Sequence, residues 1–239
     1  MKLSAFSTMA PTAATLLLWV IPASAAVLQV NDRAGFAAPF NFDFSAFGAP
    51  GSVVSTQESR TVNGVTITVQ TSGGSFGISR EGAGYTGNFR LGDTLLTQSG
   101  LSDNFILRFS GMPVYGVGTQ FEPFNSAFQG SYGAILDVYD TNGRQIADFD
   151  LAGVKTSAEN NSVPFLGALS TDVPIGYLAL SVATNRAPFF TAGDVAANTL
   201  TLSTTRTAVP EPASLTLLAV GVMACVGRLR RGKTRPSKI

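Results

Sequence analysis

Short runs of alternating apolar and polar residues constrain this chain more than any other feature of its sequence. In NFILRFS, the aromatic and aliphatic residues Phe105, Leu107 and Phe109 share one face, opposite Arg108 and Ser110. Successive side chains of a strand point to opposite faces, so this run predicts a strand with one buried face and one wet face. Runs of this kind, separated by Gly, Pro, Asn and Asp clusters, predict strands at residues 60–71, 104–110, 114–121, 134–139, 145–151, 174–183 and 199–204.

The number and spacing of these runs indicate the fold class. No stretch between them keeps a helical period, and about ten short strands in a chain of this length favour two packed sheets over a barrel. We therefore expect an all-β fold, an antiparallel two-sheet sandwich that is jelly-roll-like, in a single domain at residues 26–207. Phe is the main apolar residue, and Phe105, Phe109, Phe121 and Phe149 are the expected core side chains.

One turn is predicted in detail. Asn142-Gly143 separates the run at 134–139 from the run at 145–151. Asn-Gly is typical of a type I′ turn, in which both central residues have positive φ. The two runs should therefore form an antiparallel hairpin.

The amino end has the organisation of a secretory signal peptide. Lys2 supplies a positive charge, residues 13–21 are apolar, and Ala23-Ser24-Ala25 is a small-x-small cleavage site. We expect residues 1–25 to be a signal peptide that is cut after Ala25. The alternative is a buried amino-terminal helix.

The carboxyl end combines an apolar stretch with a basic cluster. Residues 213–227 carry no charge and would form a helix of about 22 Å, against a hydrocarbon core of about 30 Å. Arginine side chains that reach the interface could make up part of the gap, so we expect a transmembrane segment at 213–227. A basic cytoplasmic tail would follow at 228–239, because cations beside a span stay cytoplasmic. The basic residues expected to stop transfer are Arg228, Arg230, Arg231 and Lys233.

Charge divides the chain in the same way. Residues 27–209 hold nine basic and fourteen acidic residues, whereas residues 210–239 hold six basic residues against Glu211 alone. The basic residues within 27–209 are dispersed singly, which argues against nucleic acid as a partner of this region. A basic tail directly after an apolar segment suits a membrane surface.

The order of features at the carboxyl end resembles a known signal. Val209, Pro210, Glu211 and Pro212 precede the apolar segment and the basic cluster, and the two prolines favour an extended, accessible backbone. This arrangement at 208–232 resembles the PEP-CTERM sorting signal of Gram-negative bacteria that make exopolysaccharide. The resemblance implies that a membrane-embedded exosortase recognises and processes the signal. The alternative is an ordinary membrane anchor in which the PEP sequence occurs by chance.

The residue types that are missing from residues 27–209 limit the chemistry of this region. The chain has no His, its single Cys is Cys225 in the apolar segment, and its single Trp is Trp19 in the signal peptide. The usual Ser-His-Asp and Cys-His mechanisms and the commonest zinc ligand are thereby excluded. We expect no catalytic residue, no metal and no cofactor.

Three other chemistries stay open as alternatives. A His-free glycoside hydrolase or lyase would need paired carboxylates, for which Asp137, Asp148 and Asp150 are candidates. Calcium could be held by oxygen ligands. Sugars could stack on exposed aromatic rings in a lectin-like module. The candidate calcium ligands are Asp137, Asp140 and Asn142, and the candidate stacking rings are Tyr85, Tyr115, Phe124 and Tyr132.

Together these features predict an exported, non-catalytic protein of the cell surface or extracellular matrix. Its precursor would be anchored in the inner membrane and processed by an exosortase, and its mature form would associate with exopolysaccharide or biofilm. The main alternative is a carbohydrate-binding module.

Overall fold

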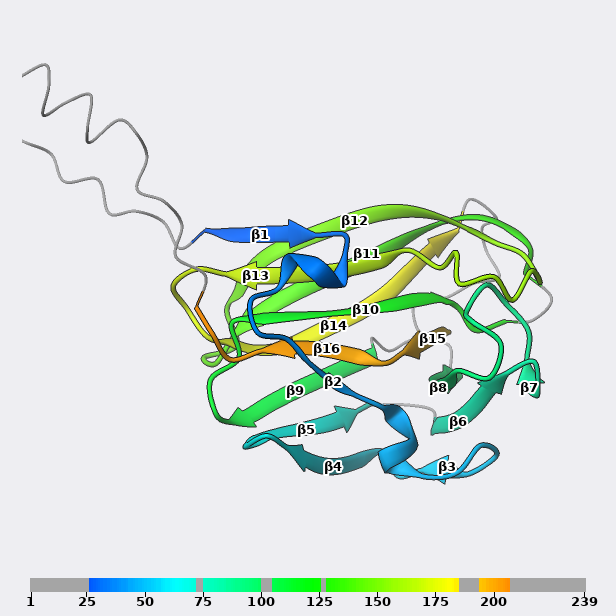
Figure 1. Ribbon diagram of the computed structural model, residues 1–239, viewed down its shortest axis with the longest axis horizontal. Coiled ribbons are helices and arrows are strands. Elements are labelled where there is room, and N and C mark those ends of the chain that lie inside the picture. Colours follow the sequence, from blue (N-terminus) through cyan, green and yellow to red (C-terminus); the bar gives the residue numbers. More distant parts are fainter. Residues whose placement is uncertain (1–25, 72–74, 100–104, 126–127, 185–193, 207–239) are drawn as a thin grey trace, which may run out of the picture.

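The computed structural model describes residues 26–71, 75–99, 105–125, 128–184 and 194–206. Within these ranges the chain forms two β-sheets and two short 3-10 helices, η1 (Arg33–Gly35) and η2 (Phe44–Phe47) (Figure 1). Among the described residues, no helix has the length and apolar character needed to cross a membrane. The expected signal peptide, at 1–25, and the expected transmembrane segment, at 213–227, lie outside these ranges.

Nearly all strand pairs in the two sheets are antiparallel; β6 and β7 form a short parallel pair. In the described ranges, the second sheet has six strands in the spatial order β12, β11, β14, β9, β5, β4. They are β4 (Gln57–Val62), β5 (Val65–Gln70), β9 (Phe105–Gly111), β11 (Gly130–Asp140), β12 (Gln145–Lys155) and β14 (Ile175–Thr184). The first sheet has ten: β1 (Val27–Val30), β2 (Phe40–Phe42), β3 (Val53–Val54), β6 (Ser75–Glu81), β7 (Gly84–Tyr85), β8 (Thr94–Ser99), β10 (Gly116–Pro123), β13 (Phe165–Ser170), β15 (Val195–Asn198) and β16 (Leu200–Ser203).

The main core lies between the two sheets. β9 turns Phe105, Leu107 and Phe109 inward, as its alternation predicts. Phe76 of β6 meets Phe105 from the other sheet, with ring centroids 5.2 Å apart in an edge-to-face contact that aromatic pairs favour. Of the expected core side chains, Phe105, Phe109 and Phe121 are buried, and Phe149 is partly buried against the same core. The expected two-sheet, all-β arrangement is confirmed.

β10 is buried along its whole length, because both of its faces are covered. Val117 and Phe121 face the main core. On the opposite face, a Cβ atom at Gly118 would come within 2.6 Å of the ring of Phe165, so glycine leaves the space that this ring occupies. This second layer explains why β10 shows no clean alternation in its sequence.

The β11–β12 hairpin forms as predicted, but its turn differs from the predicted type. Gly143 has a φ of 81°, whereas Asn142 is not among the residues with positive φ. The Asp140 N–H donates to the Arg144 carbonyl at 2.9 Å, and the pairing register shifts between Val138 and Tyr139. The connection is therefore a three-residue loop with a single left-handed glycine, not a type I′ turn.

The type I′ geometry occurs instead between β4 and β5. Asn63 and Gly64 have φ values of 48° and 77°, and Val62 pairs directly with Val65. The single strand predicted at 60–71 is thus wrong, because its Asn-Gly pair folds the run back on itself as a hairpin.

Gly64→Ala should lower the free energy of unfolding by about 1–2 kcal/mol, because an L-residue is strained at this left-handed φ. The new Cβ would also lie 2.9 Å from the Met112 sulfur. Gly143→Ala is a matched control, since its φ is also positive but no atom lies within 4 Å of its Cβ. Urea unfolding of both variants measures the difference. A loss at Gly143 that exceeds the loss at Gly64 would contradict the role of Met112.

The two ends of the described domain meet beside one loop. The Thr171 N–H and hydroxyl both donate to the Ala26 carbonyl at 3.1 Å. Arg206 lies 4.0 Å from the carboxylate of Asp172, in the same loop after β13. In Figure 1 the start of β1 (blue) and the end of β16 (orange) accordingly lie on the same side of the molecule.

Candidate functional site

The outer face of the six-stranded sheet carries a row of polar and aromatic side chains. The strand register places Ser59, Thr68, Arg108, Tyr177 and Tyr139 directly beside one another, on β4, β5, β9, β14 and β11. On β5, β9 and β11 the apolar neighbours Ile67, Leu107 and Val138 point into the core, so the alternation that builds the core also builds this row.

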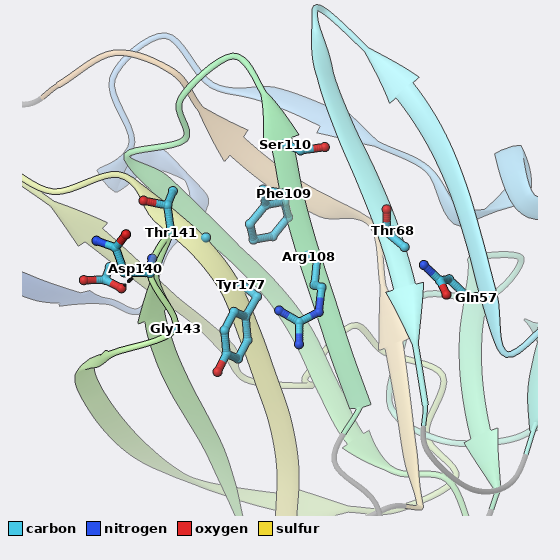
Figure 2. Close-up of a pocket in the computed structure, with 11 residues that line it drawn as sticks. Gln57, Thr68, Arg108, Phe109, Ser110, Asp140, Thr141, Gly143 and Tyr177 are labelled. Atoms are coloured by element: carbon cyan, nitrogen blue, oxygen red, sulfur yellow. Dashed lines mark hydrogen bonds between the residues drawn. The ribbon is translucent and has the colours of Figure 1, made fainter.

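A shallow pocket of about 450 Å³ opens on this face (Figure 2). Residues 108–110 of β9 lie in its centre, residues 140–143 of the hairpin loop and 176–177 of β14 form one side, and Gln57 and Thr68 form the other. Its volume is within the range of small-molecule sites.

Arg108 is held from two sides within the pocket. Its Cζ lies 4.4 Å from the ring centroid of Tyr177, and Tyr177 stacks on Tyr139 with centroids 4.2 Å apart. Its Nε donates to Gln70 Oε1 at 2.6 Å. Within the described ranges, its terminal nitrogens make no hydrogen bond or ion pair with the protein. The four N–H groups of its two terminal nitrogens are therefore available to a ligand in the pocket.

The three aspartates considered for glycoside hydrolysis share this outer face. Asp137 pairs directly with Asp148, and Ile135 pairs with Asp150 on the neighbouring position. Burial, and secondarily the charge of Asp148, raise the pKa of Asp137. The structure thus brings Asp137 and Asp148 together as like charges across one strand pair, beside the pocket and outside its lining.

The oxygen ligands considered for calcium are not assembled. The Asp140 carboxylate accepts the N–H groups of Asn142 and Arg144, both at 2.9 Å, and lies 3.5 Å from the Arg144 side chain. The Arg144 N–H contributes most to the lowered pKa of Asp140. Asp137 instead accepts from Gln145 on the sheet face. In the part of the chain that is described, no group of three or more acidic, His or Cys residues could hold a metal ion.

The aromatic rings expected to stack on sugars are mostly buried. Tyr85, Tyr115 and Tyr132 are less than 9% exposed, and Phe124 stacks on Tyr85 with centroids 5.7 Å apart. These rings support the core and are not a sugar platform. The partly exposed pair Tyr139 and Tyr177 was missed, although each follows the period-two pattern of its strand on the polar face.

A second polar cluster is sealed inside the molecule around Lys155, at the end of β12. Its ammonium donates to the Tyr85 hydroxyl at 2.7 Å, to the Pro123 carbonyl and to the Asn125 carbonyl at 3.2 Å. Three donors thus meet three acceptors. Burial nevertheless lowers the pKa of Lys155 to about 8, although Glu122 and Glu81 oppose the change.

Two buried glutamates complete this cluster. Glu122 Oε1 accepts from the Tyr85 hydroxyl at 2.8 Å and from the Asn88 N–H at 3.1 Å, and Glu81 Oε1 accepts from the Gly87 N–H at 2.7 Å. The second oxygen of each glutamate is buried without a hydrogen bond. Burial raises the pKa of both carboxyls, that of Glu81 to about 7. The cluster ties residues 85–88 to β10 and β12.

The residues expected to direct export lie outside the described ranges. This holds for the sorting residues Val209, Pro210, Glu211 and Pro212, the cleavage-site residues Ala23 and Ala25, and the basic residues Arg228, Arg230, Arg231 and Lys233. The sorting residues and the basic residues form the second candidate functional site, a segment that follows the domain in the sequence.

Comparison with known families identifies this segment. Residues 208–231 match the model of the PEP-CTERM protein-sorting motif. No curated protein matches the chain. The motif supports an exported protein that is carried to the cell surface as a membrane-anchored precursor and is processed by an exosortase, which is a membrane protein.

Proposed function

We propose that this chain is a non-catalytic protein of the cell surface or extracellular matrix, delivered there by exosortase processing at Pro210-Glu211-Pro212. The match of residues 208–231 to the sorting motif is the observation that carries the proposal. Residues 1–25 serve as a cleaved signal peptide, residues 213–227 hold the precursor in the inner membrane of a Gram-negative cell, and the basic tail stays in the cytoplasm.

The non-catalytic role rests on the chemistry of the domain. The chain lacks His, the commonest general base. The most strongly perturbed acids and the buried lysine form a sealed cluster whose hydrogen bonds tie loops to strands. The proposed role of the domain is therefore adhesive or structural, in association with extracellular polysaccharide.

The sorting role is tested by changing Pro210-Glu211-Pro212 to Ala-Ala-Ala in the native host. We expect the uncut precursor to accumulate in the membrane fraction and the processed form to disappear, because the exosortase loses the sequence that it recognises. Immunoblots of cell fractions, with mass spectrometry of both mature termini, measure this. Changing Pro236-Ser237-Lys238 to Ala-Ala-Ala is the matched control, since it also removes a proline and a charge but lies beyond the match. Normal processing of the first variant would refute the proposal.

A further inference from the structure

The outer-face pocket has an unused cation at its centre. Arg108 is 4.4 Å from the Tyr177 ring and is bonded through Nε to Gln70, so its orientation is fixed before any ligand arrives. Its terminal nitrogens have no protein partner within the described ranges. A planar guanidinium in this state is suited to a bidentate contact with a carboxylate or phosphate.

The side chains around Arg108 are mostly uncharged hydrogen-bonding groups. Hydroxyls of Thr68, Ser110 and Thr141 and amides of Gln57 and Asn142 line the pocket (Figure 2). Asp140 also lines it, but its carboxylate is occupied by the loop amides and by Arg144. One available positive charge among hydroxyls and amides favours a ligand with one negative charge and several hydroxyls.

The pocket also offers apolar surface. Gly176 and the ring of Tyr177 are part of its lining, whereas the Phe109 side chain is turned into the core. A sugar ring presents both hydroxyl groups and C–H groups, so a mixed wall of this kind matches it better than it matches a bare inorganic anion. Asp137 and Asp148 lie outside the lining, and Asp137 Oδ1 is engaged by the amide of Gln145 at 2.8 Å.

We propose that this pocket binds a carboxylated sugar residue of an acidic polysaccharide, with Arg108 holding the carboxylate and the surrounding hydroxyls and amides holding the ring hydroxyls. The site is independent of the sorting motif: loss of glycan binding would leave exosortase processing intact, and loss of processing would leave binding intact.

The test measures binding of trigalacturonic acid to the full-length chain in detergent micelles by isothermal titration calorimetry. The methyl ester of the same trisaccharide and inorganic phosphate are the comparison probes. We expect the acid to bind at least tenfold more tightly than either probe. Arg108→Gln should reduce this binding at least tenfold. Arg108→Lys should reduce it less, because lysine keeps the positive charge but cannot make the bidentate contact of the planar guanidinium.

Arg80→Gln is the matched control, since Arg80 is an exposed arginine on β6 of the other sheet. It should leave binding unchanged. Thermal unfolding of each variant separates loss of the site from loss of the fold. Equal binding of acid and ester, competition by phosphate at the same concentration as the acid, no binding of the acid, or full binding by a folded Arg108→Gln variant would each overturn the proposal.

Discussion

Replacing Lys155 with methionine is expected to lower the free energy of unfolding by about 3–5 kcal/mol, the usual cost of removing one partner from a buried charged network. The ammonium is fully buried and donates to Tyr85 and to the carbonyls of Pro123 and Asn125. Methionine keeps the volume but leaves these acceptors and the nearby Glu122 carboxylate without a cation. Chemical denaturation at neutral pH measures the loss.

The double variant Lys155→Met, Glu122→Gln tests the electrostatic origin of this loss. With both charges removed, it should be more stable than Lys155→Met alone, because the buried Glu122 charge no longer lacks its cation. Simple addition of the two single losses, or a loss below about 1 kcal/mol in Lys155→Met, would show that the charges are not coupled.

The stability of the domain should fall as pH rises from about 5 to 7. The folded-state pKa of Glu81 is about 7, above its ordinary value of 4.5. Between these values the folded state keeps a proton that the unfolded state releases, so folding is favoured at the acidic end. The expected decrease is about 2–3 kcal/mol and levels off above pH 7. Denaturant midpoints across this range measure it.

Glu81→Gln should flatten this slope, since glutamine still offers an oxygen to the Gly87 N–H but does not titrate. Glu122, whose pKa is also raised, should preserve part of the slope. Lys155 acts in a different window: its pKa falls from 10.5 to about 8, so its contribution to stability increases with pH between those values. An unchanged slope in Glu81→Gln from pH 5 to 7 would rule out Glu81 as its source.

The strands that could be predicted from the sequence are those with one face exposed to solvent. The runs that became β9, β11, β12 and β14 alternate, and the structure confirms strands there. β13 and β15 were missed because every residue in them is buried, so FLGALS and VAAN show no alternation. β6 was missed because glycine and serine interrupt its pattern. The jelly-roll-like topology stays a prediction.

The two candidate sites differ in how far the sequence reveals them. The sorting motif is linear, so its residues were identified from local order alone, and the family model confirms it. The pocket depends on neighbours across strands: Arg108, Tyr139 and Tyr177 are remote in sequence and meet only through the register of β9, β14 and β11. Lys155 gave no signal, because a single lysine at a strand end ordinarily reaches solvent.

Ala26 and Arg206 both lie beside the loop after β13, and this position has a consequence for processing of the chain at its two ends. The two ends of the described domain therefore lie on the same side of the molecule (Figure 1). The two cleavages proposed above would therefore take place on the same side of the folded domain, outside its strands.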